Sequence, residues 1–172
     1  MTTPLEQRLK QNPDAIVSLH DVFSELKELE TPERRAFLMM FHDSNEHNRT
    51  LMQSYVECLY HPMIVLELPD EIPPYRVNDN QYEDYISLKL GKAFKRIPHF
   101  VKGHNDFIEN NSKRESVFIK TLEELHKDEA ELFASLLLRK VDTKKYPGLT
   151  DELLIITFKQ YLPEGYVLDT KK

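Results

Sequence analysis

Hydrophobic side chains recur at helical spacing along most of the chain, and this pattern is strongest over residues 112–140. Phe118, Leu122 and Leu125 fall on one stripe, which is typical of a helix that packs on a core. If this helix continued without interruption, Glu129 would lie in the middle of the stripe, where an unpaired carboxylate is costly to bury. The pattern therefore predicts that the helix is broken before this glutamate.

We place the break near residues 126–128 and expect a second helix to fold back on the first, so that residues 112–140 form a central helical hairpin. Ser112, followed three residues later by Glu115, matches a capping box and predicts where the first helix begins. The predicted inner face of the second helix consists of Ala130, Phe133, Leu136 and Leu137.

Similar periodicity predicts helices elsewhere, and no segment alternates in the manner of a strand. Pro13 opens a helix that ends before Thr31, and Thr31 with Pro32 begins the next one. A third helix ends at Pro62, and Thr150 caps the last one. The predicted inward side chains are, in order, Ile16, Leu19, Phe23, Leu26 and Leu29; Phe37, Leu38 and Phe41; Leu51, Met52, Tyr55 and Leu59; Tyr85, Leu88, Leu90 and Phe94 of a helix over residues 82–96; and Leu153, Leu154, Ile156 and Phe158.

Residues 61–80 contain four prolines and almost no periodicity, which predicts an extended strap that wraps the core rather than a helix. In this interpretation Ile72 and Tyr75 point inward. The alternative is that Pro73, Pro74 and Tyr75 form a recognition peptide for a partner.

The length of 172 residues and the hydrophobic content of 40% suffice for one core, so we predict a single all-α domain over residues 1–172, a bundle of about six to seven helices. It divides into an acidic helical part over residues 1–60, the Pro-rich strap over residues 61–80 and a more basic helical part over residues 81–172. The chain has one cysteine, Cys58, which we expect to be buried and inert. No stretch matches a signal peptide or a membrane span, so we expect a soluble cytoplasmic protein without a cofactor.

Charge is distributed unevenly along the chain. Residues 1–80 hold 14 acidic and 7 basic side chains, whereas residues 81–172 hold 15 and 16. The basic surplus is concentrated in residues 89–120, where eight basic residues are interleaved with aromatic ones and accompanied by three acidic ones. Such a surface suits phosphate contact and base stacking, so one hypothesis is that the segment over residues 89–114 binds nucleic acid. The candidate contacts are Lys92, Lys95, Arg96, Lys102, Lys113 and Arg114.

Other interpretations of the same residues stay open. The lysines also fit an ordinary solvated surface around core aromatics. A protein-protein effector, whose acidic amino-terminal helices bind an enzyme, is a second functional hypothesis. A third is a metal-dependent phosphohydrolase, because such helical enzymes use a His-Asp dyad and the chain contains His20-Asp21 and His42-Asp43. Since two ligands do not make a metal site, we predict no metal and favour a protein that acts by binding.

Three pieces of the chain, LPDEIPPYRVND, KRESVFIKTLEELHKDEAELF and YPGLTDELLIITFKQYLP, occur in this order between about Leu66 and Leu162. In these pieces the chain resembles an uncharacterised protein family of T-even-like myophages, including those of marine cyanobacteria. It departs from the family pattern at residues 158–161, where a short Ala-Phe-Pro-type ending is usual, and in its longer amino-terminal half. The resemblance implies a phage accessory protein made in an infected bacterium, so the target of an effector would be a host or phage enzyme. It supplies no catalytic residue.

Overall fold

The computed structural model describes residues 3–15, 17–78 and 83–168, except for the side chains of residues 83–88. Over these residues the protein is all-α and has no β-strand, as the periodicity predicts; it has eight α-helices, where about six to seven were predicted. The α-helices are α1 (Pro4–Gln11), α2 (Leu19–Glu25), α3 (Thr31–Ser44), α4 (Glu46–Tyr60), α5 (Glu83–Lys95), α6 (Asn111–Glu124), α7 (Lys127–Leu137) and α8 (Asp151–Thr157), and the 3₁₀ helices are η1 (Leu26–Glu28), η2 (Ile97–Phe100) and η3 (Lys159–Tyr161).

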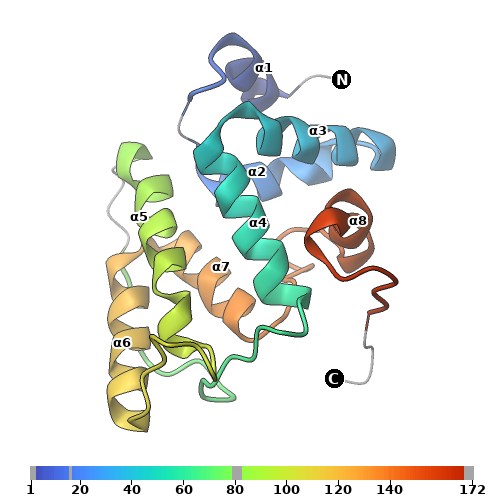
Figure 1. Ribbon diagram of the computed structural model, residues 1–172. Helices are drawn as coiled ribbons and strands as arrows, with labels where there is room; N and C mark the ends of the chain where they lie inside the picture. Colours follow the sequence, from blue (N-terminus) through green and yellow to red (C-terminus); the bar gives the residue numbers. More distant parts are fainter. Residues whose placement is uncertain (1–2, 16, 79–82, 169–172) are drawn as a thin grey trace.

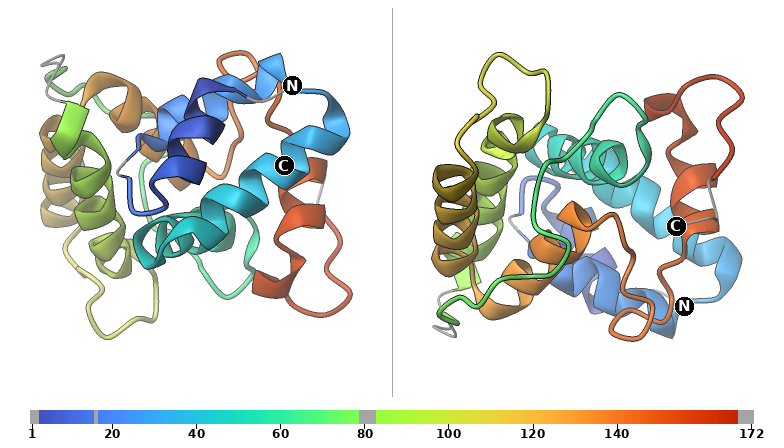
Figure 2. Two further views of the ribbon diagram at one scale, coloured as in Figure 1. Left: turned by 90° about the horizontal axis from the view of Figure 1, so that it is seen from above. Right: turned by 90° about the horizontal axis from the view of Figure 1, so that it is seen from below.

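Helix α7 lies in the middle of the bundle, where it contacts α2, α4, α5 and α6. Helices α5 and α6 lie side by side at one side of the molecule, and α8 lies at the opposite side (Figures 1 and 2). The buried hydrophobic side chains form one cluster that takes members from every α-helix, so the described elements share a single core. No helix among the described residues is long and apolar enough to cross a membrane.

The break predicted near residues 126–128 is confirmed, because α6 ends at Glu124 and α7 begins at Lys127. Leu125 and His126 are extended, and the imidazole of His126 accepts a hydrogen bond from a backbone N–H of the first turn of α7. The predicted apolar stripes of both helices are buried, which confirms their inward faces. Only α7 is central, however, since α6 lies at the side of the bundle (Figure 1).

The start of α6 corrects the predicted capping box. The side chain of Asn110, not that of Ser112, accepts the hydrogen bond from the backbone N–H of Lys113, at 2.8 Å. Asparagine caps helices as well as serine does, and here it comes two residues earlier.

The sequence predicts that a helix begins at Pro13, but none begins there. Helix α1 comes before this proline, and Thr3 caps it by accepting a hydrogen bond from the backbone N–H of Glu6. In α3, by contrast, Thr31 is the first helical residue, and the N-cap is Glu30, which makes no side-chain cap hydrogen bond. The chain then connects to α2, which begins at Leu19. Ile16 lies outside the described residues.

Residues 61–78 contain no helix and are held to the rest of the protein by isolated contacts. Leu66 forms an antiparallel β-bridge with Val101, and Tyr75 packs partly buried against the core. Ile72 is 41% exposed, so its predicted inward orientation is wrong. The strap as a whole stays a prediction, and its last two residues lie outside the described residues.

Two further inward predictions are affected. Ile156 on α8 is 46% exposed, because α8 is short and only one of its sides faces the core. The side chains of Tyr85 and Leu88 on α5 lie outside the described residues, whereas Leu90 and Phe94 are buried as predicted.

Candidate anion-binding pocket

Arg114, one of the predicted nucleic-acid contacts, is a structural residue. It is buried, and its guanidinium donates hydrogen bonds to the backbone carbonyls of Glu67 and Ile108 at 2.7 and 2.8 Å and to the side chain of Asn111. The same group lies over the ring of Phe107. An arginine with these partners ties the loop before α6 to residues 61–78 and does not present its donors to a phosphate on the surface.

Arg96 and Lys102 each have an acidic partner. The guanidinium of Arg96 donates to the hydroxyl of Thr121 at 3.0 Å and lies 2.8 Å from a carboxylate oxygen of Glu124. The ammonium of Lys102 lies 3.6 Å from the carboxylate of Glu67, and both are well exposed, so this pair is weak.

The remaining predicted contacts are lysines at the surface. Lys95 in the last turn of α5 and Lys113 in the first turn of α6 are exposed. Lys92 is exposed as well and lines a pocket. The structure therefore brings Lys92 and Arg96 together and leaves Lys95, Lys102, Lys113 and Arg114 outside the pocket lining.

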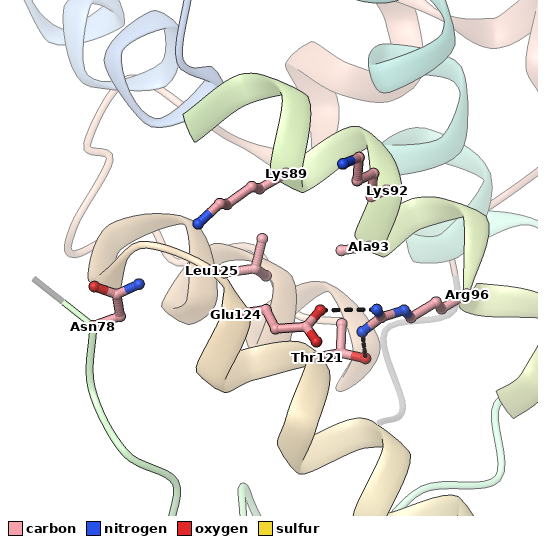
Figure 3. A pocket seen from close by; sticks show the side chains of 8 residues that line it. All are labelled: Asn78, Lys89, Lys92, Ala93, Arg96, Thr121, Glu124 and Leu125. Atoms are coloured by element: carbon pink, nitrogen blue, oxygen red, sulfur yellow. Dashed lines mark hydrogen bonds and ion pairs between the residues drawn. The ribbon is translucent and has the colours of Figure 1, made fainter. Parts of the chain in front are cut away.

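This pocket lies between α5 and the carboxyl-terminal end of α6 and has a volume of about 210 Å³. Figure 3 shows Lys89 and Lys92 on α5 and Arg96, which directly follows α5, together with the α6 side chains Thr121 and Glu124. Spacings of three and seven residues explain why all three cations line the same pocket. Ala93 and Leu125 give the pocket an apolar wall, and Asn78 is the remaining described residue of the lining.

Three cations and one carboxylate line this space, so its electrostatic potential favours an anion. No salt bridge joins Lys89 or Lys92 to a carboxylate in the described part of the chain, and the carboxylate of Glu124 is shared only with Arg96. Lys89 falls within the basic segment but is not among the predicted contacts. The signal that could have found it is its helical spacing from Lys92 and Arg96.

The two His-Asp pairs lie apart from this pocket, and their imidazoles already have partners. His42 contacts the carboxylate of Asp43 at 2.7 Å through one ring nitrogen and the hydroxyl of Tyr161 through the other. Among the described residues, no three His, Cys, Asp or Glu side chains gather in a way that could hold a metal ion. The geometry therefore gives no support to the phosphohydrolase alternative.

His20 belongs to a second polar cluster, centred on Glu129. The carboxylate of Glu129 accepts hydrogen bonds from the hydroxyl of Ser18 and, at 3.1 Å, from the backbone N–H of His20. Because Ser18 precedes the first residue of α2, Glu129 caps that helix from α7, and the helix dipole favours its negative charge. Glu129 is therefore buried even though the helix is broken before it.

Burial nevertheless dominates the protonation of Glu129. The side chain is fully buried, one of its oxygens has no hydrogen-bond partner, and burial raises its pKa to about 7. The ring of His20 contacts the hydroxyl of Tyr146 at 2.8 Å and lies 3.6 Å from the carboxylate of Asp128, which in turn pairs with Lys145 at 3.0 Å. These groups bind one another and join α2, α7 and the loop before α8.

Cys58 is buried on α4, and burial raises the pKa of its thiol to about 12. A thiol with this pKa is almost wholly protonated at neutral pH and is a poor nucleophile.

The protein is thus an all-α domain with one cationic pocket between two helices at its side. A family model described as a family of unknown function (DUF6433) matches residues 26–143, and the chain belongs to this family. The matched range includes α3 to α7 and therefore the whole pocket. It also begins well before Leu66, so the family relationship extends into the amino-terminal half. No curated protein and no solved structure matches the chain.

Proposed function

We propose that this protein binds nucleic acid through the side formed by α5 and α6, with the anion-binding pocket as its main phosphate contact. The observation that carries this proposal is that Lys89, Lys92 and Arg96 line one pocket, in which Glu124 is the one carboxylate among the described residues. Lysine and arginine in such a position attract phosphate oxygens and release the counterions that surround them.

Exposed lysines on α6 extend the cationic surface away from the pocket. Lys113 and Lys120 lie seven residues apart, and Glu124, which lines the pocket, follows four residues later. Residues with these spacings share one side of a helix, so the two lysines form a row that leads toward the pocket. A strand that enters the pocket and follows this row would contact about three to four phosphates.

The acidic surplus of residues 1–80 limits which side of the protein can contact nucleic acid. A protein with a net charge of −6 is repelled by nucleic acid on most of its surface, so contact is restricted to the basic side. Lysine contacts to phosphates carry no sequence information, and we expect weak sequence preference. In this proposal the protein is a phage accessory protein that acts in the cytoplasm of an infected bacterium by binding, without a cofactor. The support for its phage origin is the resemblance of the three sequence pieces.

Fluorescence anisotropy with labelled single-stranded and double-stranded DNA and RNA tests the proposal. The wild-type protein should bind at micromolar concentration in low salt, and the logarithm of its affinity should fall with the logarithm of the salt concentration with a slope of about −2 to −4. Lys89→Glu with Lys92→Glu should weaken binding on the order of 100-fold and reduce the slope by about 2. Circular dichroism should show an unchanged helical spectrum, because both lysines lie at the surface of α5.

The matched control is Lys27→Glu with Lys159→Glu. These lysines are exposed, lie in η1 and η3 outside the pocket, and change the net charge by the same amount. If the control weakens binding as much as the pocket variant, the effect is one of total charge and the pocket has no special role. If wild-type protein binds none of the nucleic acids at low salt, the proposal is wrong and the protein-protein effector becomes the leading hypothesis.

A further inference from the structure

The pocket between α5 and α6 has more cationic charge than one phosphodiester needs. Arg96 is neutralised in part by Glu124, whereas Lys89 and Lys92 have no carboxylate partner in the described part of the chain. Among the described residues of the lining, the four charged groups leave a surplus of two positive charges. A phosphodiester has one negative charge, but a terminal phosphate has about 1.5 to 2 at neutral pH, so the terminal group matches the surplus better.

The shape of the pocket points in the same direction. Helix α5 forms one wall, the end of α6 forms the opposite wall, and Asn78 lies at the edge (Figure 3). An internal phosphodiester continues as polymer on both sides, whereas a terminal phosphate enters with the strand on one side only. A volume of about 210 Å³ accommodates a phosphate with its sugar and leaves little room for a second nucleotide.

The side chains that line the pocket form two groups, one suited to the phosphate and the other to the sugar of such a ligand. The ammonium groups of Lys89 and Lys92 each offer three donors that rotate to meet phosphate oxygens. Arg96 is held in place by Thr121, whose own hydroxyl donates to the carbonyl of Val117 at 2.8 Å, so the guanidinium is positioned before a ligand arrives. Ala93 and Leu125 offer an apolar surface to the sugar carbons.

We infer that the pocket recognises the terminal phosphate of a nucleic-acid strand, a phosphomonoester at its 5′ or 3′ end. This inference rests on the proposed nucleic-acid binding and specifies which group enters the pocket. The lysines of α6 then hold the phosphodiesters that follow the terminal group along the strand.

Competition binding with oligonucleotides of one sequence and different ends tests the inference. Strands with a 5′-phosphate, a 3′-phosphate or hydroxyl groups at both ends are compared by anisotropy at constant salt. We expect at least one phosphorylated strand to bind about 10-fold more tightly than the hydroxyl strand, since a contact to a charged group has about this effect. The two phosphorylated arms show which end is recognised, and a nucleoside monophosphate should compete at millimolar concentration.

Two further measurements distinguish the pocket from a general preference for charge. Lys89→Gln with Lys92→Gln should remove the preference for phosphorylated ends, whereas the control Lys27→Gln with Lys159→Gln should keep it. The preference should also decrease as the pH falls from about 7.5 to 5.5, because a terminal phosphate loses its second charge near pH 6 while a phosphodiester does not change.

The outcomes separate this inference from the proposed function. If phosphorylated and hydroxyl strands bind equally tightly and with the expected salt dependence, nucleic-acid binding stands and the end recognition is refuted. If the pocket variant keeps the preference, another site recognises the end and the inference is also refuted. If no strand binds, the proposed function itself fails.

Discussion

Replacing Glu129 with glutamine should change how the stability of the protein depends on pH. An ordinary glutamate has a pKa of 4.5, whereas the buried carboxyl of Glu129 has a pKa of about 7. Between these values the folded protein keeps a proton that the unfolded chain has lost, so unfolding releases a proton and stability falls as the pH rises. The contribution of this group is constant below about pH 4.5, is lost progressively up to about pH 7 and changes no further above it.

The size of the effect follows from the shift in pKa. Each unit corresponds to about 1.4 kcal/mol, so the wild-type protein should lose roughly 3 kcal/mol from this group between pH 4.5 and 8. Glutamine has the same shape as the protonated acid and still accepts the hydrogen bonds from Ser18 and His20. Glu129→Gln should therefore match the wild type at pH 5, apart from a constant offset, and exceed it by roughly 3 kcal/mol more at pH 8.

The assay is urea unfolding followed by circular dichroism at several pH values between 5 and 8. The relevant quantity is the difference in unfolding free energy between variant and wild type, because the titration of His20 occurs in both proteins and largely cancels. Glu115→Gln, which changes an exposed glutamate on α6, is the matched control for the loss of one carboxylate. A constant difference for Glu129→Gln would show that the carboxyl is ionised across the whole range and that the argument from burial is wrong.

Two further substitutions test the packing. Gly148→Ala should destabilise the protein by about 1–3 kcal/mol, since its new methyl group would lie 2.6 Å from the backbone carbon of Leu26, whereas Gly91→Ala meets only the side chain of His47 at 3.1 Å. Thermal unfolding of both variants checks this, and an equal effect of the two would contradict it. Arg114→Lys should lower the unfolding free energy by about 1–3 kcal/mol, because lysine cannot donate to Glu67, Ile108 and Asn111 at once. Urea unfolding beside the exposed control Lys113→Arg measures this loss, and an unchanged midpoint would mean that the guanidinium is replaceable.

Local patterns were sufficient to predict most of the helices. The stripe of Phe118, Leu122 and Leu125 and the cap at Thr150 depend on residues within one or two turns, and both are confirmed. The break before Glu129 was also predicted, but the position of its carboxylate was not. Its partners Ser18 and His20 lie more than one hundred residues away in the sequence, and periodicity contains no information about such contacts.

The basic residues show the same limit of prediction from sequence. A count of basic residues treats Arg96, Arg114 and Lys92 alike, although the fold gives each a different role. Arg114 donates to the nearby carbonyl of Ile108 and also to that of Glu67, which is its neighbour because residues 61–78 pass the start of α6. Reversing its charge would therefore test the stability of the fold before it tested any binding.

The pocket itself depends on where two helices meet rather than on a motif. Lys89 and Lys92 on α5 and Arg96 just after it lie along one side whatever the partner helix, but they line a pocket only because the end of α6 lies opposite them. Glu124 lowers the positive charge of this pocket, because its salt bridge holds Arg96 in place and offsets one positive charge. Lys89 and Lys92 are then the cations that attract an anionic ligand. Glu124→Gln should therefore raise the affinity for a terminal phosphate by a few-fold at low salt, since it removes a repulsion while the amide can still accept a hydrogen bond from Arg96.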